Sequence, residues 1–296
     1  MTTFTNRTQR LRNITLAAIT VTTLAAGLAG CAPSASAQDA TSGHPALTAV
    51  ANRITVGTAS VNVLCTGTAT AKPTVILLAG EPDPLTTFTA LQKILSKTTR
   101  VCSYDRLGEG ESAKPASAQT LADSTAVLNG LLQAEKITGK VVVVGHSLGG
   151  LIAATFAHRY PNRVAGVVLM DATAPSVAGA IDTLIPASAT GAAGEVRTEV
   201  GAFSTAATNP EMLVSDGQPV GSLGKIPVTV VQHGKPIYAP VPTYGAQLQS
   251  IWTAGQHQLA ALSTVSKFVT ATKSGHYIYL DQPALAIRLI KNATGI

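Results

Sequence analysis

Hydrophobic positions along this chain switch between short continuous runs and longer segments of helical spacing. The continuous runs are rich in β-branched residues, and four of them occupy residues 74–78, 141–144, 164–170 and 226–232. Runs of this length and composition are typical of strands buried on both faces of a parallel sheet. Apolar residues at helical spacing predict helices at 88–96, 121–134 and 248–262. This alternation predicts one α/β domain with a mostly parallel central sheet flanked by helices.

Shorter elements complete the pattern toward both ends of the domain. Ordered structure is expected to begin near Leu47. Further strands are expected at 53–56, 61–65, 100–104 and 268–271. Between residues 172 and 225 the sequence loosens into Ala, Thr, Gly and Ser with short apolar clusters, a pattern that specifies little of the structure there.

The hydrophobic period changes from that of a strand to that of a helix within the few residues around Ser147. The valine run at 141–144 precedes it, and apolar residues from Leu148 onward recur at helical spacing. Gly145 and Gly149 lack Cβ, which permits a tight reversal and close packing of the helix against the strand. The helix N-terminus directs free N–H groups and a positive dipole end at any anion that forms beside Ser147.

Residues 145–149 form a G-x-S-x-G motif between a strand and a helix, and in this context the chain resembles the α/β-hydrolase superfamily. The resemblance covers about residues 47–293. It implies the α/β-hydrolase fold, with a small cap inserted after the sixth strand at about 172–225. It also implies that Ser147 is the nucleophile of acyl transfer. The alternative is a chance match, because the five letters alone are weak evidence.

In this superfamily, the loop after the third strand donates one backbone N–H to the oxyanion hole, commonly from a His-Gly-x segment. Here the loop occupies residues 79–84, and Ala79 replaces the usual histidine. By register with the family segment the donor is Glu81, whose carboxylate must then point away from the oxyanion. The resemblance implies the backbone N–H of Leu148 as the second donor. The alternative is that Glu81 is a solvated turn residue.

The segment S-G-H-x-x-x-x-D-Q-P at 274–283 resembles the family's histidine loop, which implies that His276 is the general base. The family usually places the catalytic acid after the seventh strand, but no carboxylate occurs from residue 217 to residue 280. Asp171 ends the sixth strand, on the side of the sheet where parallel strands present site residues. Asp171 is therefore the expected acid, and its alternative role is to cap the following turn.

The resemblance assigns other polar residues to structural roles. Residues 105–112 resemble the superfamily's D-R-x-G-x-G-x-S turn, which implies that Asp105 and Ser112 shape the floor of the site. His146 fills the variable position of the serine motif. Four histidines match no family motif, namely His44, His158, His233 and His257.

These residues imply a serine hydrolase, and esterase- or lipase-like cleavage of a small carboxylic ester is the leading interpretation. A serine at the apex excludes the dehalogenases and epoxide hydrolases of this fold, which use aspartate there. The alternatives are amidase or peptidase action, a cofactor-free haloperoxidase-like side activity, and a non-catalytic binding protein on the same fold. Neither H-E-x-x-H nor a Cys/His ligand spacing is present, so no metal or cofactor is expected.

Residues 1–30 are expected to be an export signal, because three arginines precede an uncharged run too short for a comfortable membrane span. The run ends in Leu-Ala-Gly-Cys31, which resembles the bacterial lipoprotein box and implies a lipid anchor on Cys31 at the outer face of the membrane. Residues 31–46 then form a flexible tether to the domain at 47–296. The alternative is cleavage after Ala37, which releases a secreted soluble protein.

Charge and cysteine content agree with an exported domain that does not bind nucleic acid. The net charge of +6 falls to +3 without the three arginines of the signal, and no run of Lys and Arg with interleaved aromatics remains. If Cys31 is lipidated, two cysteines remain, Cys65 and Cys102. An even number of cysteines in an exported protein predicts a disulfide. The resemblance places the second and fourth strands, which carry them, side by side. Two buried free thiols are the alternative.

Overall fold

The computed structural model of the protein describes residues 51–215 and 217–296. The expected export signal, the lipidation site Cys31 and the tether lie outside the described residues. Among the described helices, none combines the length and the apolarity needed to cross a bilayer.

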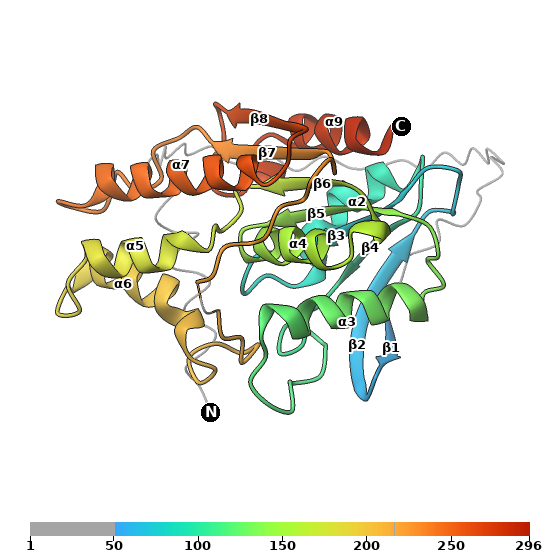
Figure 1. The fold of residues 1–296 in the computed structure, drawn as a ribbon, viewed down its shortest axis with the longest axis horizontal. Helices are drawn as coiled ribbons and strands as arrows, with labels where there is room; N and C mark the ends of the chain where they lie inside the picture. The colour runs from blue at the N-terminus through green and yellow to red at the C-terminus, as the bar shows by residue number, and fades with distance from the viewer. Residues whose placement is uncertain (1–50, 216) are drawn as a thin grey trace, which may run out of the picture. The chain divides into compact units, whose positions relative to one another are not determined.

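One eight-stranded sheet organises the described part of the chain (Figure 1). Its strands are β1 (Asn52–Val56), β2 (Ala59–Thr66), β3 (Thr74–Leu78), β4 (Val101–Tyr104), β5 (Val141–His146), β6 (Val164–Met170), β7 (Val228–His233) and β8 (Ser266–Ala271). They lie in the order β1-β2-β4-β3-β5-β6-β7-β8. β1 and β2 pair antiparallel with their neighbours, whereas all pairs from β4 to β8 are parallel. The mostly parallel sheet predicted from the sequence is confirmed.

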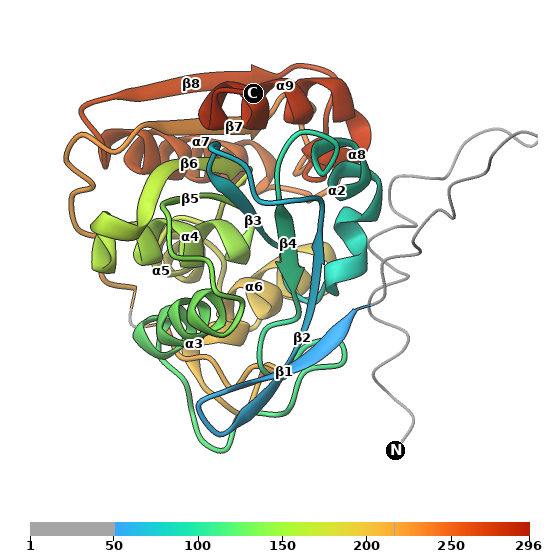
Figure 2. The same ribbon diagram turned by 90° about the vertical axis from the view of Figure 1, so that its right-hand side faces the viewer.

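Helices cover both faces of this sheet (Figure 2). They are α2 (Thr89–Leu95), α3 (Leu121–Ala134), α4 (Leu148–Arg159), α7 (Gly245–Ala261), α8 (Ile278–Asp281) and α9 (Pro283–Thr294). α3, α4 and α7 contribute to one hydrophobic core, and α2, α8 and α9 contribute to the other. Within β5, Val141 and Val143 face the first core while Val142 and Val144 face the second. The valine run therefore serves both layers, and each fully buried side chain contributes roughly 1.5–3 kcal/mol.

The segment after β6 is more regular than its loose sequence pattern indicates. It contains α5 (Ser176–Leu184), α6 (Gly191–Gly201) and a 3-10 turn at Ala202–Ser204. α5 packs against both α6 and α7 (Figure 1). Val177 and Ile181 lie one helical turn apart on α5, and both are buried. Two well-placed apolar residues and tertiary packing thus stabilise a helix that composition alone does not specify.

Prolines set the limits of two helical segments. The helix expected at 88–96 begins as a 3-10 turn at Leu85–Phe88, directly after Pro84, and continues as α2. The C-terminal helical segment divides at Gln282, because Pro283 occupies the first turn of α9, where its missing N–H is not needed.

Asp105 closes the turn that follows β4. Its buried carboxylate accepts hydrogen bonds from Leu85 N at 2.6 Å, Asn62 Nδ2 at 2.8 Å and Glu111 N at 2.9 Å. A Cβ on Gly110 would lie 2.3 Å from the Asp105 carboxylate oxygen, so glycine is required there. These bonds fix the end of the loop after β3 against the turn after β4.

A disulfide joins Cys65 on β2 to Cys102 on β4. The two residues are direct partners in the antiparallel pairing of these strands, and their Cα atoms lie 4.1 Å apart. The bridge closes a loop with a sequence separation of 37 residues. A closed loop of this length stabilises the fold by roughly 2–4 kcal/mol, because it restricts the unfolded chain.

Candidate active site

Ser147 lies at the junction of β5 and α4. Its backbone has φ 50° and ψ −124°, and a positive φ at a non-glycine residue persists only when the surrounding structure enforces it. A Cβ on Gly149 would lie 2.3 Å from the Ala79 carbonyl oxygen, so glycine allows α4 to approach the end of β3. This strained turn holds the half-buried Ser147 at the carboxyl edge of the sheet, directly before the first helical residue, Leu148.

The imidazole of His276 is hydrogen-bonded to the carboxylate of Asp171. Asp171 follows β6 and is fully buried, and its Oδ2 lies 2.6 Å from His276 Nδ1. Because an ionised carboxylate only accepts hydrogen bonds, Nδ1 carries the proton and Nε2 of the neutral ring keeps its lone pair. The His276 side chain is 27% exposed, so the ring remains accessible to a substrate. The arrangement is that of a general base and its orienting acid.

Adjacent strands bring Ser147 to the same edge of the sheet as this pair. His146 is the register partner of Met170, so the residues that follow them, Ser147 and Asp171, leave the sheet side by side. In the described part of the chain, no hydrogen bond joins Ser147 Oγ to the His276 ring. Such contacts are often long in free enzymes and shorten when substrate is bound.

Two further residues, which sequence reasoning missed, hold the Asp171 carboxylate. His233 ends β7, and it donates from its backbone N–H at 3.0 Å and from Nδ1 at 2.8 and 2.9 Å. Trp252 on α7 donates from Nε1 at 2.9 Å. They lie 62 and 81 residues away from Asp171 in sequence. The one available signal was the position of His233 at the carboxyl end of a parallel strand, where site residues gather.

These donors keep Asp171 ionised. Burial alone would raise the pKa of Asp171, but hydrogen bonds from His233 and His276 outweigh burial and hold the pKa well below its usual range. Burial alone would lower the pKa of His233, but its hydrogen bond to Asp171 raises it. The carboxylate is therefore an anion at neutral pH, and it can stabilise an imidazolium on His276.

His146, at the variable position of the serine motif, supports the loop that carries His276. Its Nε2 lies 3.0 Å from the carbonyl oxygen of His276. Burial, with a smaller effect of His276, lowers the pKa of His146 well below its usual value, so the ring is neutral. A carbonyl oxygen only accepts, so Nε2 donates this bond. The His146 ring also packs 4.9 Å from the ring of Tyr277, which fixes the histidine loop against the serine turn.

The loop after β3 lies against Ser147. A Cβ on Gly80 would be only 3.1 Å from the Ser147 Cβ, so the backbone that leads into Glu81 runs beside the nucleophile. Glu81 is half-buried, and its pKa is raised to about 7 by burial and then by the carboxylates of Glu211 and Glu199. Its side chain is therefore largely neutral below that pH, which removes the charge that would oppose an oxyanion.

Other histidines of the described chain have structural contacts. His158 Nδ1 lies 3.1 Å from the Ser222 carbonyl oxygen, and the His257 ring stacks on Phe268 at 4.5 Å. Within the described residues, no group of three or more His, Cys, Asp or Glu side chains is arranged to hold a metal ion. His44 lies outside the described residues.

Comparisons with known proteins agree with this architecture. A family model described as alpha/beta hydrolase fold matches residues 73–212. The structure is similar to a thermophilic esterase from Thermogutta terrifontis, with a TM-score of 0.58 and 22% identity, over 82% of this chain and 97% of that one. The chain has the α/β-hydrolase fold.

Sequence relatives of this α/β-hydrolase-fold chain are similar over shorter stretches. It is 34% identical over 100 residues to an uncharacterized protein of Mycobacterium tuberculosis, which is 34% of this chain and 29% of that protein. It is 40% identical over 68 residues to Lipase 1 of Psychrobacter immobilis, which is 23% of this chain and 22% of the lipase. The chain thus spans less than a third of the length of either relative. Together, the family match and the structural similarity support the α/β-hydrolase fold.

Proposed function

We propose that the protein is a serine hydrolase that cleaves small carboxylic esters through an acyl-enzyme on Ser147. The observation that carries this proposal is the 2.6 Å contact between Asp171 Oδ2 and His276 Nδ1 beside the strained turn of Ser147. Similarity to Lipase 1 over a short stretch and to a solved esterase in fold supports ester chemistry. Similarity of fold alone proves no activity, so the proposal rests on the site.

The proposed reaction uses only groups of this chain. His276 Nε2 takes the Ser147 proton as Oγ attacks the ester carbonyl, and the backbone N–H groups of Leu148 and Glu81 bind the oxyanion. Asp171 stabilises the imidazolium. His276 then protonates the leaving alcohol, the acyl-enzyme forms, and water attacks it by the same route to release the acid.

A substrate panel tests this proposal. Esters graded by acyl length are compared with amides of the same acyl groups, using the native protein and Ser147→Ala. Ester turnover that requires Ser147 is expected. Faster turnover of amides would replace the ester proposal with an amidase or peptidase. No Ser147-dependent turnover, together with tight binding of an acyl compound, would favour a binding protein.

Glu81 is expected to make the ester activity sensitive to pH near 7. Its pKa is about 7, so the side chain becomes an anion as the pH rises through that value. A negative charge near the oxyanion raises the barrier, and about 1 kcal/mol of repulsion would slow the native enzyme about fivefold. The ratio of kcat for Glu81→Gln to native kcat should therefore rise between pH 6 and pH 8. Glu111→Gln, on an exposed side chain, is the matched control, and a flat ratio for both variants would contradict the expectation.

We also propose that Cys31 carries a lipid that holds the domain at the outer face of a bacterial membrane. Support comes from the Leu-Ala-Gly-Cys31 segment after an uncharged run. Metabolic labelling with an alkynyl fatty acid should mark the native protein and not Cys31→Ser, which should also leave the membrane fraction. Several acyl chains are needed for stable anchoring. Mass spectrometry that finds an N-terminus at Gln38 would refute the anchor.

A further inference from the structure

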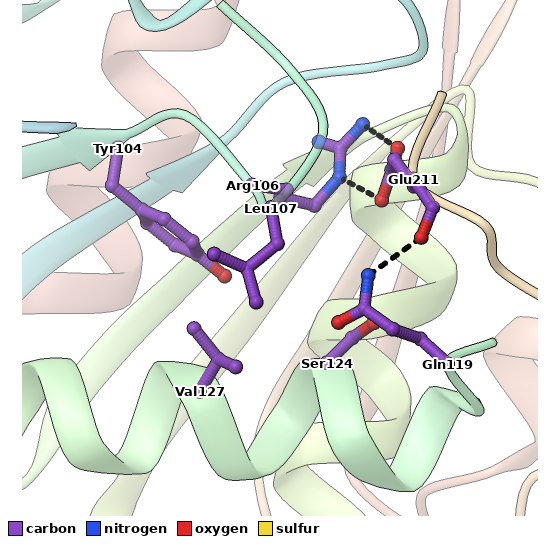
Figure 3. A pocket seen from close by; sticks show the side chains of 7 residues that line it. All are labelled: Tyr104, Arg106, Leu107, Gln119, Ser124, Val127 and Glu211. Carbon is purple, nitrogen blue, oxygen red and sulfur yellow. Dashed lines mark hydrogen bonds and ion pairs between the residues drawn. The ribbon is translucent and has the colours of Figure 1, made fainter. Parts of the chain in front are cut away.

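A buried arginine connects the loop after β3 to the segment inserted after β6, and Figure 3 shows its contact with Glu211 of that segment. Arg106 follows β4, and its guanidinium forms a two-point ion pair with Glu211, with Nε to Oε2 at 2.9 Å and Nη2 to Oε1 at 2.6 Å. The two side chains are 4% and 1% exposed. Burial alone would lower the pKa of Arg106, but the Glu211 carboxylate more than offsets burial, so the guanidinium stays charged.

The other donors of the same guanidinium bind the backbone beside Ser147. Arg106 Nη1 donates to the Ala79 carbonyl oxygen at 2.5 Å, and Nη2 donates to that of Gly80 at 3.3 Å. The Gly80 carbonyl and the Glu81 N–H belong to one planar peptide unit, and in a trans unit they point in opposite directions. An arginine that fixes the carbonyl therefore also fixes the direction of the N–H, which faces away from Arg106.

Glu211 is itself held in place. Gln119 donates from Nε2 to the Glu211 carbonyl oxygen at 2.6 Å, as Figure 3 shows, and the Gln119 backbone pairs with Met212 and Val214. The cavity lined by Arg106, Glu211 and Gln119 has a volume of about 10 Å³, far too small for an organic substrate. This cluster therefore supports the backbone beside Ser147 and binds no substrate.

We propose that Arg106 is a positioning residue, which directs the Glu81 N–H into the oxyanion hole, and that Glu211 of the cap segment locks Arg106 in that orientation. The inference rests on the proposed function, because it assigns a role in the same reaction. The planar guanidinium of arginine can bind a carboxylate at two points and two carbonyls at the same time. The ammonium group of lysine lacks this fork and cannot make the same set of contacts.

The test is a double variant, Arg106→Met with Glu211→Leu, assayed on an ester that the native protein cleaves. Removing both charges avoids an unpaired buried charge, and apolar residues of similar size often replace such a pair without loss of stability. Loss of one oxyanion donor costs about 10²–10³ in kcat. We expect kcat to fall about 100-fold while KM changes less than about threefold. The matched control is Arg100→Met with Glu135→Leu, a partly buried ion pair at the other end of β4, which should keep native kcat.

A folded double variant with native kcat would overturn the inference and leave the proposed function intact. Absence of Ser147-dependent turnover in the native protein would instead defeat the proposed function and the inference with it. If the double variant does not fold, the single variants Arg106→Lys and Glu211→Gln are assayed instead, and their kcat values are compared with each other. Glu211→Gln keeps an acceptor for Arg106, so it should retain more kcat than Arg106→Lys.

A crystal structure of the native protein with an organophosphonate bonded to Ser147 gives an independent answer. The phosphonyl oxygen stands in for the oxyanion, so Glu81 N should lie within about 3.1 Å of it while Arg106 still binds the Ala79 and Gly80 carbonyls. A phosphonyl oxygen bound by other donors, with Glu81 N turned away, would overturn the inference.

Discussion

Replacing Ser147 with alanine is expected to lower kcat for an ester by about 10⁶-fold, the loss seen when a nucleophile of this kind is removed. Ser147 has a positive φ and lies at the same edge of the sheet as the Asp171–His276 pair. No covalent intermediate can form without its hydroxyl. Turnover measurements should be paired with labelling by a fluorophosphonate probe. The native protein should be labelled at Ser147 alone, and Ser147→Ala should not be labelled.

Ser250→Ala is the matched control for this experiment. Ser250 is exposed on α7, where its Oγ bonds only the backbone carbonyl of Ala246 at 3.0 Å. This variant should keep native turnover and native labelling. Equal labelling of Ser147→Ala and the native protein would remove the case for a serine hydrolase.

Asp171→Asn is expected to lower kcat by up to ~10⁴-fold while the fold is retained. The native carboxylate accepts hydrogen bonds from His276, His233 and Trp252. An amide has only one accepting oxygen, so its NH₂ group must face at least one of these donors. If it faces His276 Nδ1, the ring takes the other tautomer, and Nε2 carries a proton where a lone pair is needed.

The comparison for this prediction is Asp182→Asn in the cap. Asp182 is 42% exposed and pairs with Arg197 at 3.0 Å, so its loss should change kcat little. Thermal unfolding of both variants separates a catalytic effect from a loss of structure, because Asp171→Asn also leaves a buried donor without its partner. Near-normal turnover of a folded Asp171→Asn protein would show that another group supplies the acid.

The sheet was predictable from the sequence because each core strand carries its own signal. The four valines of β5 face both hydrophobic cores, so a short contiguous run indicates by itself a strand buried on both faces. The serine turn was likewise predictable, since its strand, glycines and helix are contiguous. The limits of α7 and the helices of the cap were not predictable from the sequence. These segments are rich in small residues, and tertiary packing determines where they are helical.

The supporting contacts of the site could not be read from the sequence. His233, Trp252 and Arg106 reach their partners across 62, 81 and 105 residues, and no local pattern marks such pairs. Asp171 was identified by elimination, since no carboxylate follows the seventh strand and Asp171 ends the sixth. The structure adds that three side chains converge on it, because β7, α7 and the loop after β8 each bring one of them to the end of β6.

The link between Glu211 and Arg106 limits how this protein can be recombined with its relatives. A chimaera that exchanges residues 172–225 for another cap would remove Glu211 and leave the 4%-exposed guanidinium of Arg106 without a counterion. The helices of the inserted segment, α5 and α6, end before this point. A junction placed between residues 205 and 209 would therefore allow the cap helices to be exchanged while the ion pair stays within one parent.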